Sequence, residues 1–184
     1  MILEIVKYGD SILRAKGARV PEVTEEIRRL AADMLDTMHA ANGVGLAAQQ
    51  VGVALQLTVI DVAEIEDRAS TMTIEGAEVR LEEWMPLILL NPVLELGKVR
   101  EVGTEGCLSF PELSADVSRA VGVKVKATLL DGSDFGFEAT GLLARALQHE
   151  VDHLQGVLFI DRMNSATKAG MSGRLKRLQK EAAG

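Results

Sequence analysis

Gln-His-Glu-Val-Asp-His-Leu-Gln-Gly, residues 148–156, contains two of the three histidines in the chain. These two, His149 and His153, are four residues apart and would therefore lie on one face of a helix. Two imidazoles at this spacing can bind the same metal ion, and the neighbouring carboxylate of Glu150 can take a proton from water bound to that metal. The stretch matches the H-E-x-x-H pattern and therefore predicts a hydrolytic metal site.

The residues around this stretch favour a helix. Thr140 is a suitable N-cap, Gly156 is a suitable C-cap, and apolar residues recur between them: Leu143, Ala146, Leu147 and Leu154. Two histidines can also share a helix face without binding a metal. A third ligand decides between these alternatives, because a catalytic site usually has three protein ligands and an open position for water.

Candidates for the third ligand lie on both sides of the motif. Metzincin proteases place a histidine six residues after the second one, but that position is Phe159 here. The downstream carboxylates Asp161 and Glu181 are weak candidates, and Glu181 lies in a glycine-interrupted tail. Upstream is the only cysteine, Cys107, within Glu105-Gly-Cys-Leu-Ser109, and its soft thiolate would complete a Cys-His-His set.

Length and composition limit the class of protein. A chain of 184 residues, 47% of them apolar, is long enough for one domain with a sizeable core. The net charge of −7 argues against a surface that coats nucleic acid, so we expect no DNA partner. A single cysteine cannot form an intramolecular disulfide, which favours either a reducing compartment or a functional thiol.

The chain shows no targeting or membrane segment. Residues 1–7 combine a short apolar run with Glu4 and have no small-residue cleavage site, unlike a signal peptide. The longest apolar run, Trp84 to Leu90, contains Pro86 and falls short of the ~18 residues that cross a membrane. We therefore expect a cytoplasmic protein without a membrane partner.

The remaining sequence predicts an α+β fold, with mixed or antiparallel strands packed around the central helix that carries the metal motif. Residues 24–42 are expected to form a first amphipathic helix, with His39 as a surface residue in its last turn. The acidic residues 63–85 are expected to form an inserted loop or hairpin on the surface. Asn91-Pro92 restricts its strand to an edge or interrupted position. The predicted strands cover residues 55–62, 87–96, 121–130, 135–139 and 157–160.

Residues 164–184 differ in charge from the rest of the chain. They contain one acidic residue, Glu181, and five cations: Lys168, Arg174, Lys176, Arg177 and Lys180. We expect residues 1–163 to form the catalytic domain and residues 164–184 a basic tail of the same domain. A basic tail can dock on RNA phosphates, but Gly170 and Gly173 weaken any helix and also allow a solvated, frayed end.

Three separated motifs together resemble a known family. They are Gly43-x-Gly-x-Ala-Ala-x-Gln50, Glu105-Gly-Cys-Leu-Ser109 and Gln148-His-Glu-x-Asp-His-Leu-x-Gly156, in this order. With these motifs, the chain resembles a peptide deformylase over about residues 2–163. The resemblance implies an enzyme that removes the formyl group from the N-formylmethionine of newly synthesised proteins and releases formate.

The resemblance also implies residue roles. Cys107, His149 and His153 would hold one metal ion, and the metal lowers the pKa of a bound water that acts as the nucleophile. Glu150 would be the general base for that water and then the general acid for the leaving amine. The side-chain amide of Gln50 and the backbone N–H of Leu108 would stabilise the negative charge that develops on the formyl oxygen.

Substrate contacts follow from the same resemblance. Gly45 is expected to offer main-chain hydrogen bonds to the N-formylmethionyl nascent peptide. Arg145 either borders the groove or forms a surface salt bridge, and both alternatives remain open. In this family the C-terminal extension can bind the ribosome, which makes docking through the basic tail the second expected partner contact. The apolar pocket for the methionine side chain is expected from Val44, Leu142, Ala146 and His149.

The motif does not determine the metal. A Cys-His-His set suits zinc, iron, cobalt or nickel, and the resemblance favours Fe²⁺ in the cell, with Zn²⁺, Ni²⁺ or Co²⁺ in purified protein.

Two other classes of protein use such a helix. A zinc endopeptidase would need the missing third zincin ligand, and a metal-stabilised binding module would normally have a fourth protein ligand. The insertion at 63–85 and the absence of an arginine in 111–117 bear on peptide preference beyond methionine.

Overall fold

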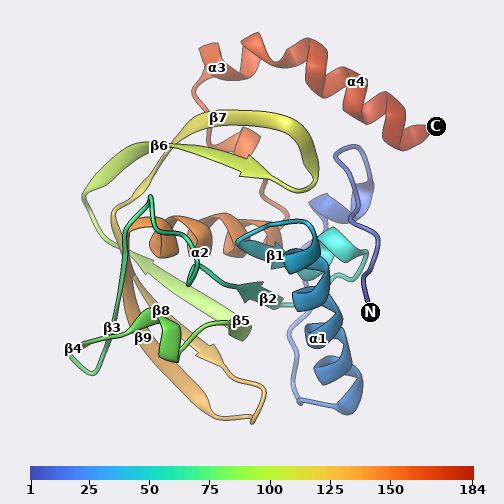
Figure 1. Ribbon diagram of the computed structural model, residues 1–184. Helices are drawn as coiled ribbons and strands as arrows, with labels where there is room; N and C mark the ends of the chain where they lie inside the picture. Colours follow the sequence, from blue (N-terminus) through green and yellow to red (C-terminus); the bar gives the residue numbers. More distant parts are fainter.

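The fold places one helix between two separate β-sheets. A computed structural model of residues 1–184 confirms the α+β class that the sequence predicts. Helix α2 (Gly141–Leu154) lies in the centre, with a curved sheet on one side and a two-stranded ribbon on the other (Figure 1). The other helices are α1 (Glu25–Ala40), α3 (Ser165–Gly170), α4 (Ser172–Ala183) and the short 3-10 helices η1 (Ser11–Arg14), η2 (Ala48–Val51) and η3 (Leu81–Glu83).

The large sheet has seven strands in the order β1-β2-β5-β8-β9-β3-β4, and every neighbouring pair is antiparallel. β1 stands first in this order and is therefore paired on one side only. In β8, Val123, Val125 and Ala127 alternate with exposed or partly exposed residues because one face of the strand packs into the core. The seven strands are β1 (Gly45–Ala47), β2 (Leu57–Ile60), β3 (Ser70–Ile74), β4 (Ala77–Val79), β5 (Leu87–Leu96), β8 (Gly122–Thr128) and β9 (Asp134–Thr140).

The two-stranded ribbon consists of β6 (Arg100–Cys107) and β7 (Phe110–Ala120), which pair with each other and with no strand of the large sheet. The sequence analysis predicted neither strand. β6 contains glycines and charged residues and shows no apolar alternation. β7 does alternate, with Leu113, Ala115 and Val117 buried, and this signal was overlooked.

Helix α2 is buried around most of its circumference. Eleven of its 14 residues are buried, as expected for a helix between two layers. Thr140 precedes the helix as predicted, but its hydroxyl hydrogen-bonds Thr71, and the Ser70 hydroxyl caps the helix by accepting from the Leu143 N–H at 2.9 Å. After the helix, Gly156 has a φ of 77°, the left-handed conformation that favours glycine.

Helix α1 supports the strand that borders the metal motif. It begins where the sequence predicts, and the Thr24 hydroxyl accepts a hydrogen bond from the Ile27 N–H. Met34 and Met38 are fully buried in a cluster with residues of β1 and β2. The chain passes from α1 through Gly43 directly into β1, so this packing holds the glycine-rich segment in place.

Three predictions about strands need correction or refinement. Residues 157–160 form no strand, because the Asp161 carboxylate accepts a hydrogen bond from the Leu158 N–H and closes the 3-10 turn η4 (Phe159–Asp161). β5 is not an edge strand but lies between β2 and β8; it is interrupted at Asn91, whose φ is 51°. Residues 63–85 do contain a hairpin, and β3 of that hairpin extends the large sheet by pairing with β9.

The basic tail is helical and packed against the rest of the molecule. Met171 and Leu175 are buried in a cluster that includes Leu13, Phe110 and Phe159, so the tail is not a frayed end. Its five cations are all exposed.

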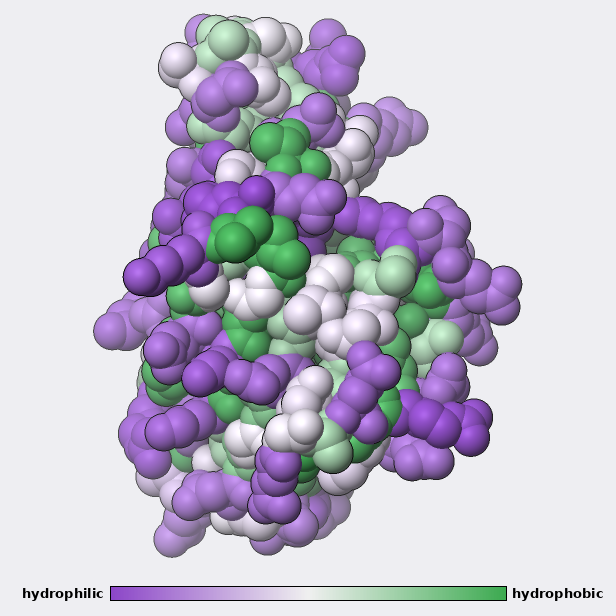
Figure 2. All heavy atoms as spheres, turned by 90° about the vertical axis from the view of Figure 1, so that its left-hand side faces the viewer, coloured by the Kyte–Doolittle hydropathy of each residue, from purple (hydrophilic) through white to green (hydrophobic).

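Hydrophilic side chains also cover most of the face shown in Figure 2, with small apolar patches between them. No helix in the structure has the length and apolar character needed to span a membrane.

Candidate metal centre

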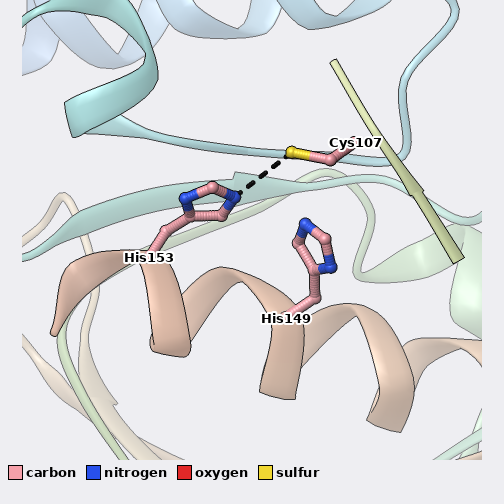
Figure 3. Close-up of side chains that lie close together, drawn as sticks. All are labelled: Cys107, His149 and His153. Atoms are coloured by element: carbon pink, nitrogen blue, oxygen red, sulfur yellow. Dashed lines mark hydrogen bonds between the residues drawn. The ribbon is translucent and has the colours of Figure 1, made fainter. Parts of the chain in front are cut away.

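Cys107, His149 and His153 come together between the ribbon and helix α2. Cys107 is the last residue of β6, and the two histidines lie one turn apart on α2 with their rings pointing toward the thiol (Figure 3). The Cys107 Sγ lies 3.4 Å from the His153 Nε2, and one donor atom of each residue lies within 4.8 Å of the other two. The histidines are buried, whereas the cysteine is partly exposed.

This donor set fits a divalent transition metal. Ligand distances of about 2.0–2.3 Å around a tetrahedral ion place the donor atoms roughly 3.3–3.8 Å apart, which agrees with the separation of Cys107 and His153. One thiolate and two imidazoles suit zinc, iron, cobalt or nickel. The structure brings no fourth His, Cys, Asp or Glu into the group, so a metal held here would have three protein donors and one open coordination position.

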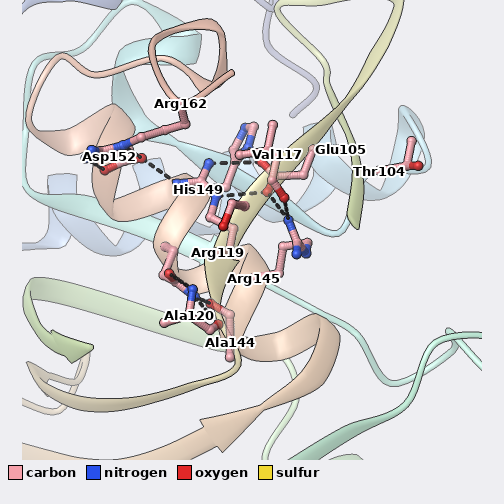
Figure 4. Close-up of polar contacts among 12 residues, drawn as sticks. Thr104, Glu105, Val117, Arg119, Ala120, Ala144, Arg145, His149, Asp152 and Arg162 are labelled. Atoms are coloured by element: carbon pink, nitrogen blue, oxygen red, sulfur yellow. Dashed lines mark hydrogen bonds and ion pairs between the residues drawn. The ribbon is translucent and has the colours of Figure 1, made fainter. Parts of the chain in front are cut away.

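Glu105 supports the centre from the ribbon. It lies two residues before Cys107 on β6, so both side chains point to the same face, toward α2. Its Oε1 accepts from the Arg119 Nη2 at 2.9 Å and pairs with the His149 Nδ1 at 2.8 Å. Its Oε2 accepts from the Arg119 Nε at 2.8 Å and the Arg145 Nη1 at 2.7 Å (Figure 4). Four donors therefore surround this carboxylate.

The surroundings of Glu105 fix the state of His149. Burial alone would raise the pKa of Glu105, but the hydrogen bonds from Arg119 and His149 and their charge outweigh burial and hold that pKa well below its usual range. Glu105 is thus an acceptor only, and the Nδ1 of His149 must donate to it. Burial lowers the pKa of His149, but hydrogen bonds to Cys107 and Glu105 and the charges of Cys107 and Glu150 raise it well above its usual range, so without a metal the Nε2 is protonated as well. A metal bound on the side of Cys107 would replace that proton.

Arg119 continues this network to the surface. It is 3% exposed, and its Nη1 donates to the Asp152 Oδ2 at 2.6 Å; Asp152 in turn accepts from Arg162, which is exposed. The sequence analysis missed the roles of Glu105, Arg119 and Asp152. A signal for Arg119 was present, because it continues the alternation of Leu113, Ala115 and Val117, and a cation in a buried row needs partners.

Glu150 lies beside the candidate metal ligands and forms no ion pair. It is 4% exposed, and its Oε2 has no hydrogen-bond partner. Burial raises the pKa of Glu150 to about 7, even though His149 acts in the opposite direction. The carboxyl packs so closely against Gly45 that a Cβ there would lie 2.8 Å from its Oε1. The second glycine of the Gly43–Gln50 motif therefore makes room for this group.

Gln50 and Leu108 present N–H donors at the same place. The Oε1 of Gln50 accepts from the Ala47 N–H at 3.0 Å, which turns its Nε2 toward the Ser109 Oγ at 3.1 Å and the Cys107 Sγ at 3.6 Å. Leu108 occupies the turn between β6 and β7, and its backbone N–H has no acceptor within the chain. Gln50 and the residue after Cys107 thus each supply an N–H donor near the thiol.

A groove of about 630 Å³ runs past these groups. Gly45 lies on the edge strand at one side of the groove, and Arg68 of the insertion reaches its wall by donating to the Thr104 carbonyl at 3.2 Å. Arg145 also lines the groove but is 7% exposed and ion-paired with Glu105, so it is not a surface salt bridge. The other predicted substrate contacts that line the groove are Val44, Leu142, Ala146 and His149. The third histidine, His39, pairs with Asp61 and takes no part.

Sequences similar to this chain share one description. The family model described as Polypeptide deformylase matches residues 2–169. A peptide deformylase from Methylacidiphilum infernorum is 47% identical over 180 residues, which cover 98% of this chain and 94% of that protein. Another, from Opitutus terrae, is 43% identical over 184 residues and is covered to the same extents, 98% and 94%.

Solved structures similar to this one carry the same description. The crystal structure of a peptide deformylase from Ehrlichia chaffeensis has a TM-score of 0.84 at 33% identity and covers 100% of this chain and 99% of its own. A peptide deformylase from Arabidopsis thaliana has a TM-score of 0.82 at 37% identity, with 97% and 91% covered. The similarity therefore includes both sheets and the helix between them.

Proposed function

The chain belongs to the polypeptide deformylase family, which removes the N-terminal formyl group of nascent proteins in a metal-dependent reaction, and from this premise we propose which residues perform each step. The observation that supports the assignment best is the convergence of three groups from three separate motifs. A Cys-His-His donor set, a buried carboxyl with a free oxygen and a fixed amide N–H meet beside one groove, which is lined by Cys107, His149, Glu150 and Gln50.

Cys107, His149 and His153 are the proposed metal ligands. When bound, a divalent metal supplies Lewis acidity, which lowers the pKa of a coordinated water and polarises the carbonyl group of the substrate. The thiolate and the two imidazoles favour a transition metal, and we assign Fe²⁺ as the ion in the cell and Zn²⁺, Ni²⁺ or Co²⁺ as occupants of purified protein. Glu105 holds the His149 ring in the required tautomer.

Glu150 is the proposed general acid and base. A pKa near 7 lets its carboxyl accept a proton from the attacking water and then release that proton at neutral pH. The proton goes to the nitrogen of the leaving methionine, so that formate and a free amino terminus are formed. The Oε2 of Glu150, which has no partner within the chain, is free for this transfer.

Gln50 and Leu108 are the proposed oxyanion donors. As the formyl carbon becomes tetrahedral, negative charge develops on its oxygen, and N–H groups fixed in advance stabilise that charge. The Gln50 Nε2 is held by the bond that Gln50 Oε1 accepts from Ala47, and the Leu108 N–H has no competing acceptor. Both groups therefore need little rearrangement.

The groove provides a place for the formylmethionyl peptide. β1 is an edge strand, so the main chain around Gly45 can pair with an extended substrate. Val44, Leu142 and Ala146 supply apolar surface for the methionine side chain, and the aliphatic part of Arg145 borders the same pocket. Because formyl carries only hydrogen where acetyl carries a methyl group, close walls at Gln50, Cys107 and Glu150 would exclude acetyl by shape.

Formate release from formyl-Met-Ala-Ser by metal-loaded protein tests these roles. Wild type should release formate and leave an internal peptide bond intact, which separates it from an endopeptidase. Glu150→Gln should keep the metal but lose turnover, because an amide cannot transfer the proton. A Glu150→Gln protein with the turnover and pH profile of wild type would rule out the acid and base role.

The basic tail is the proposed ribosome contact. Residues 164–184 form a tail of the same domain as residues 1–163, because Met171 and Leu175 pack into the core of that domain. The five exposed cations of the tail face solvent and could bind RNA phosphate near the site where formylated chains emerge. This location implies a cytoplasmic enzyme. If these cations bind RNA phosphate, the affinity of the enzyme for the ribosome should fall steeply as the salt concentration rises.

A further inference from the structure

The candidate metal centre is assembled from two units that share no β-ladder. Cys107 belongs to the β6–β7 ribbon, whereas His149 and His153 belong to helix α2. The ribbon pairs with no strand of the large sheet. Main-chain pairing therefore leaves the distance between thiol and imidazoles undetermined, and side-chain contacts must set it.

Gln148 bonds Ala120 and Asp152 pairs with Arg119 near the end of β7, and Arg145 makes the contacts that reach both strands of the ribbon. It lies on α2 one turn before His149, and its guanidinium reaches both strands of the ribbon. Its Nη1 donates to the Glu105 Oε2 at 2.7 Å and to the Val117 carbonyl at 2.8 Å, and its Nη2 donates to the Glu101 carbonyl at 2.9 Å. One side chain of α2 thus ties down two positions of β6 and one of β7.

Gly103 of β6 provides the space for this guanidinium. A Cβ at Gly103 would lie 2.9 Å from both the Cζ and the Nη2 of Arg145 and 3.1 Å from its Nε. Separations below 3 Å are not tolerated between such atoms, and the guanidinium is held in place by three acceptors. A side chain at position 103 would therefore displace the guanidinium or push the ribbon away from the helix.

We infer that Arg145 and Gly103 act together as a clamp that sets the distance between Cys107 and the two histidines. This inference rests on the proposed metal site. Arg145 is then a positioning residue for metal retention. Arg119 continues to pair with Glu105 when Arg145 is removed, so the carboxylate keeps a cation and its bond to His149. The expected loss therefore comes from the ribbon moving relative to α2.

Metal retention in four variants tests the clamp. Arg145→Met and Gly103→Val should each weaken metal binding by about 10- to 100-fold, measured by competition with a chelator. The double variant should be no weaker than either single variant, because both changes break the same contact. Arg145→Lys should retain more metal than Arg145→Met, because a lysine keeps the positive charge. It should retain less metal than wild type, because a lysine cannot reach all three acceptors.

Matched controls separate the clamp from general damage. Arg100→Met removes an arginine that bonds only to Ser118 within the ribbon, and Gly136→Val fills an exposed strand position where a Cβ has no contact closer than 3.7 Å. Both should keep the metal affinity of wild type. In cobalt-loaded protein, the thiolate-to-cobalt absorption should weaken in Arg145→Met and Gly103→Val but not in the controls. If Arg145→Met fails to fold, Gly103→Val and Arg145→Lys carry the test.

Three results would overturn the clamp. One is wild-type metal affinity in Arg145→Met with a raised KM for formyl-Met-Ala-Ser, which would make Arg145 a substrate contact. The second is additive loss in the double variant, which would mean that Arg145 and Gly103 act independently. The third is equal loss in the Arg100→Met control. A wild-type protein that binds no metal would instead overturn the proposed metal site.

Discussion

Replacing Glu150 with glutamine should make the metal-free protein more stable above neutral pH. The Glu150 carboxyl is buried, its Oε2 has no partner, and burial raises its pKa to about 7. In the unfolded chain the same group ionises near pH 4.5. Between these pH values the folded protein binds more protons than the unfolded chain, so its free energy of unfolding falls as the pH rises through this window.

The size of this effect follows from the two pKa values. The interval from 4.5 to about 7, at about 1.36 kcal/mol per pH unit, corresponds to a loss of roughly 3 kcal/mol that is complete above pH 7. Glutamine has nearly the same shape and cannot ionise, so Glu150→Gln should not show this loss. The two proteins should be similarly stable below about pH 4.5, and the variant should be more stable above pH 7.

Urea unfolding of both metal-free proteins over this pH range measures the difference. Glu150 and His149 each shift the pKa of the other, so the difference between the two curves reports Glu150 together with its coupling to His149. Glu83→Gln, at an exposed position of η3, controls for the loss of one negative charge. Parallel stability curves for wild type and Glu150→Gln would refute the argument that burial keeps this carboxyl protonated.

Three further predictions concern other parts of the chain. Cys107→Ser should lose metal and nearly all formate release, measured by metal analysis and turnover, because a neutral hydroxyl replaces a thiolate; one metal per chain with normal turnover would contradict the ligand assignment. Gln50→Ala should keep the metal and lower kcat by about 10²- to 10³-fold, and an unchanged kcat would remove it from the oxyanion site. Replacing Arg174, Lys176 and Arg177 with glutamine should reduce ribosome co-sedimentation at low salt and spare short-peptide turnover; undiminished co-sedimentation would rule out docking.

The histidine pair of the candidate metal centre could be inferred from local sequence because its chemistry depends on a short spacing, whereas Cys107 and Gln50 were assigned through the resemblance to a family. His149 and His153 share a helix face by their four-residue separation, and Gln50 and Cys107 lie within recognisable motifs. Even the role of Glu105 was accessible, since a strand places residues 105 and 107 on one face. That inference required β6 to be predicted as a strand, and its glycines and charges conceal it.

Contacts between distant segments could not be inferred in this way. The acceptors of Arg145 lie 28 to 44 residues away in the chain, so no local pattern distinguishes a bridging arginine from a surface ion pair. The tail shows the same limit. Gly170 and Gly173 lower helix propensity, but burial of Met171 and Leu175 outweighs that cost and decides the structure.

β1, the edge strand proposed to pair with the substrate, is short. An unpaired strand edge accepts any extended chain, and long edges of this kind promote aggregation. β1 has only three residues, Gly45 to Ala47, so an added chain gains few backbone hydrogen bonds there. Such weak pairing is independent of side-chain identity, which suits an enzyme that must accept the start of every new protein. If the substrate pairs with β1 as proposed, a longer strand would add backbone hydrogen bonds to the product, slow its release and attract other unfolded chains.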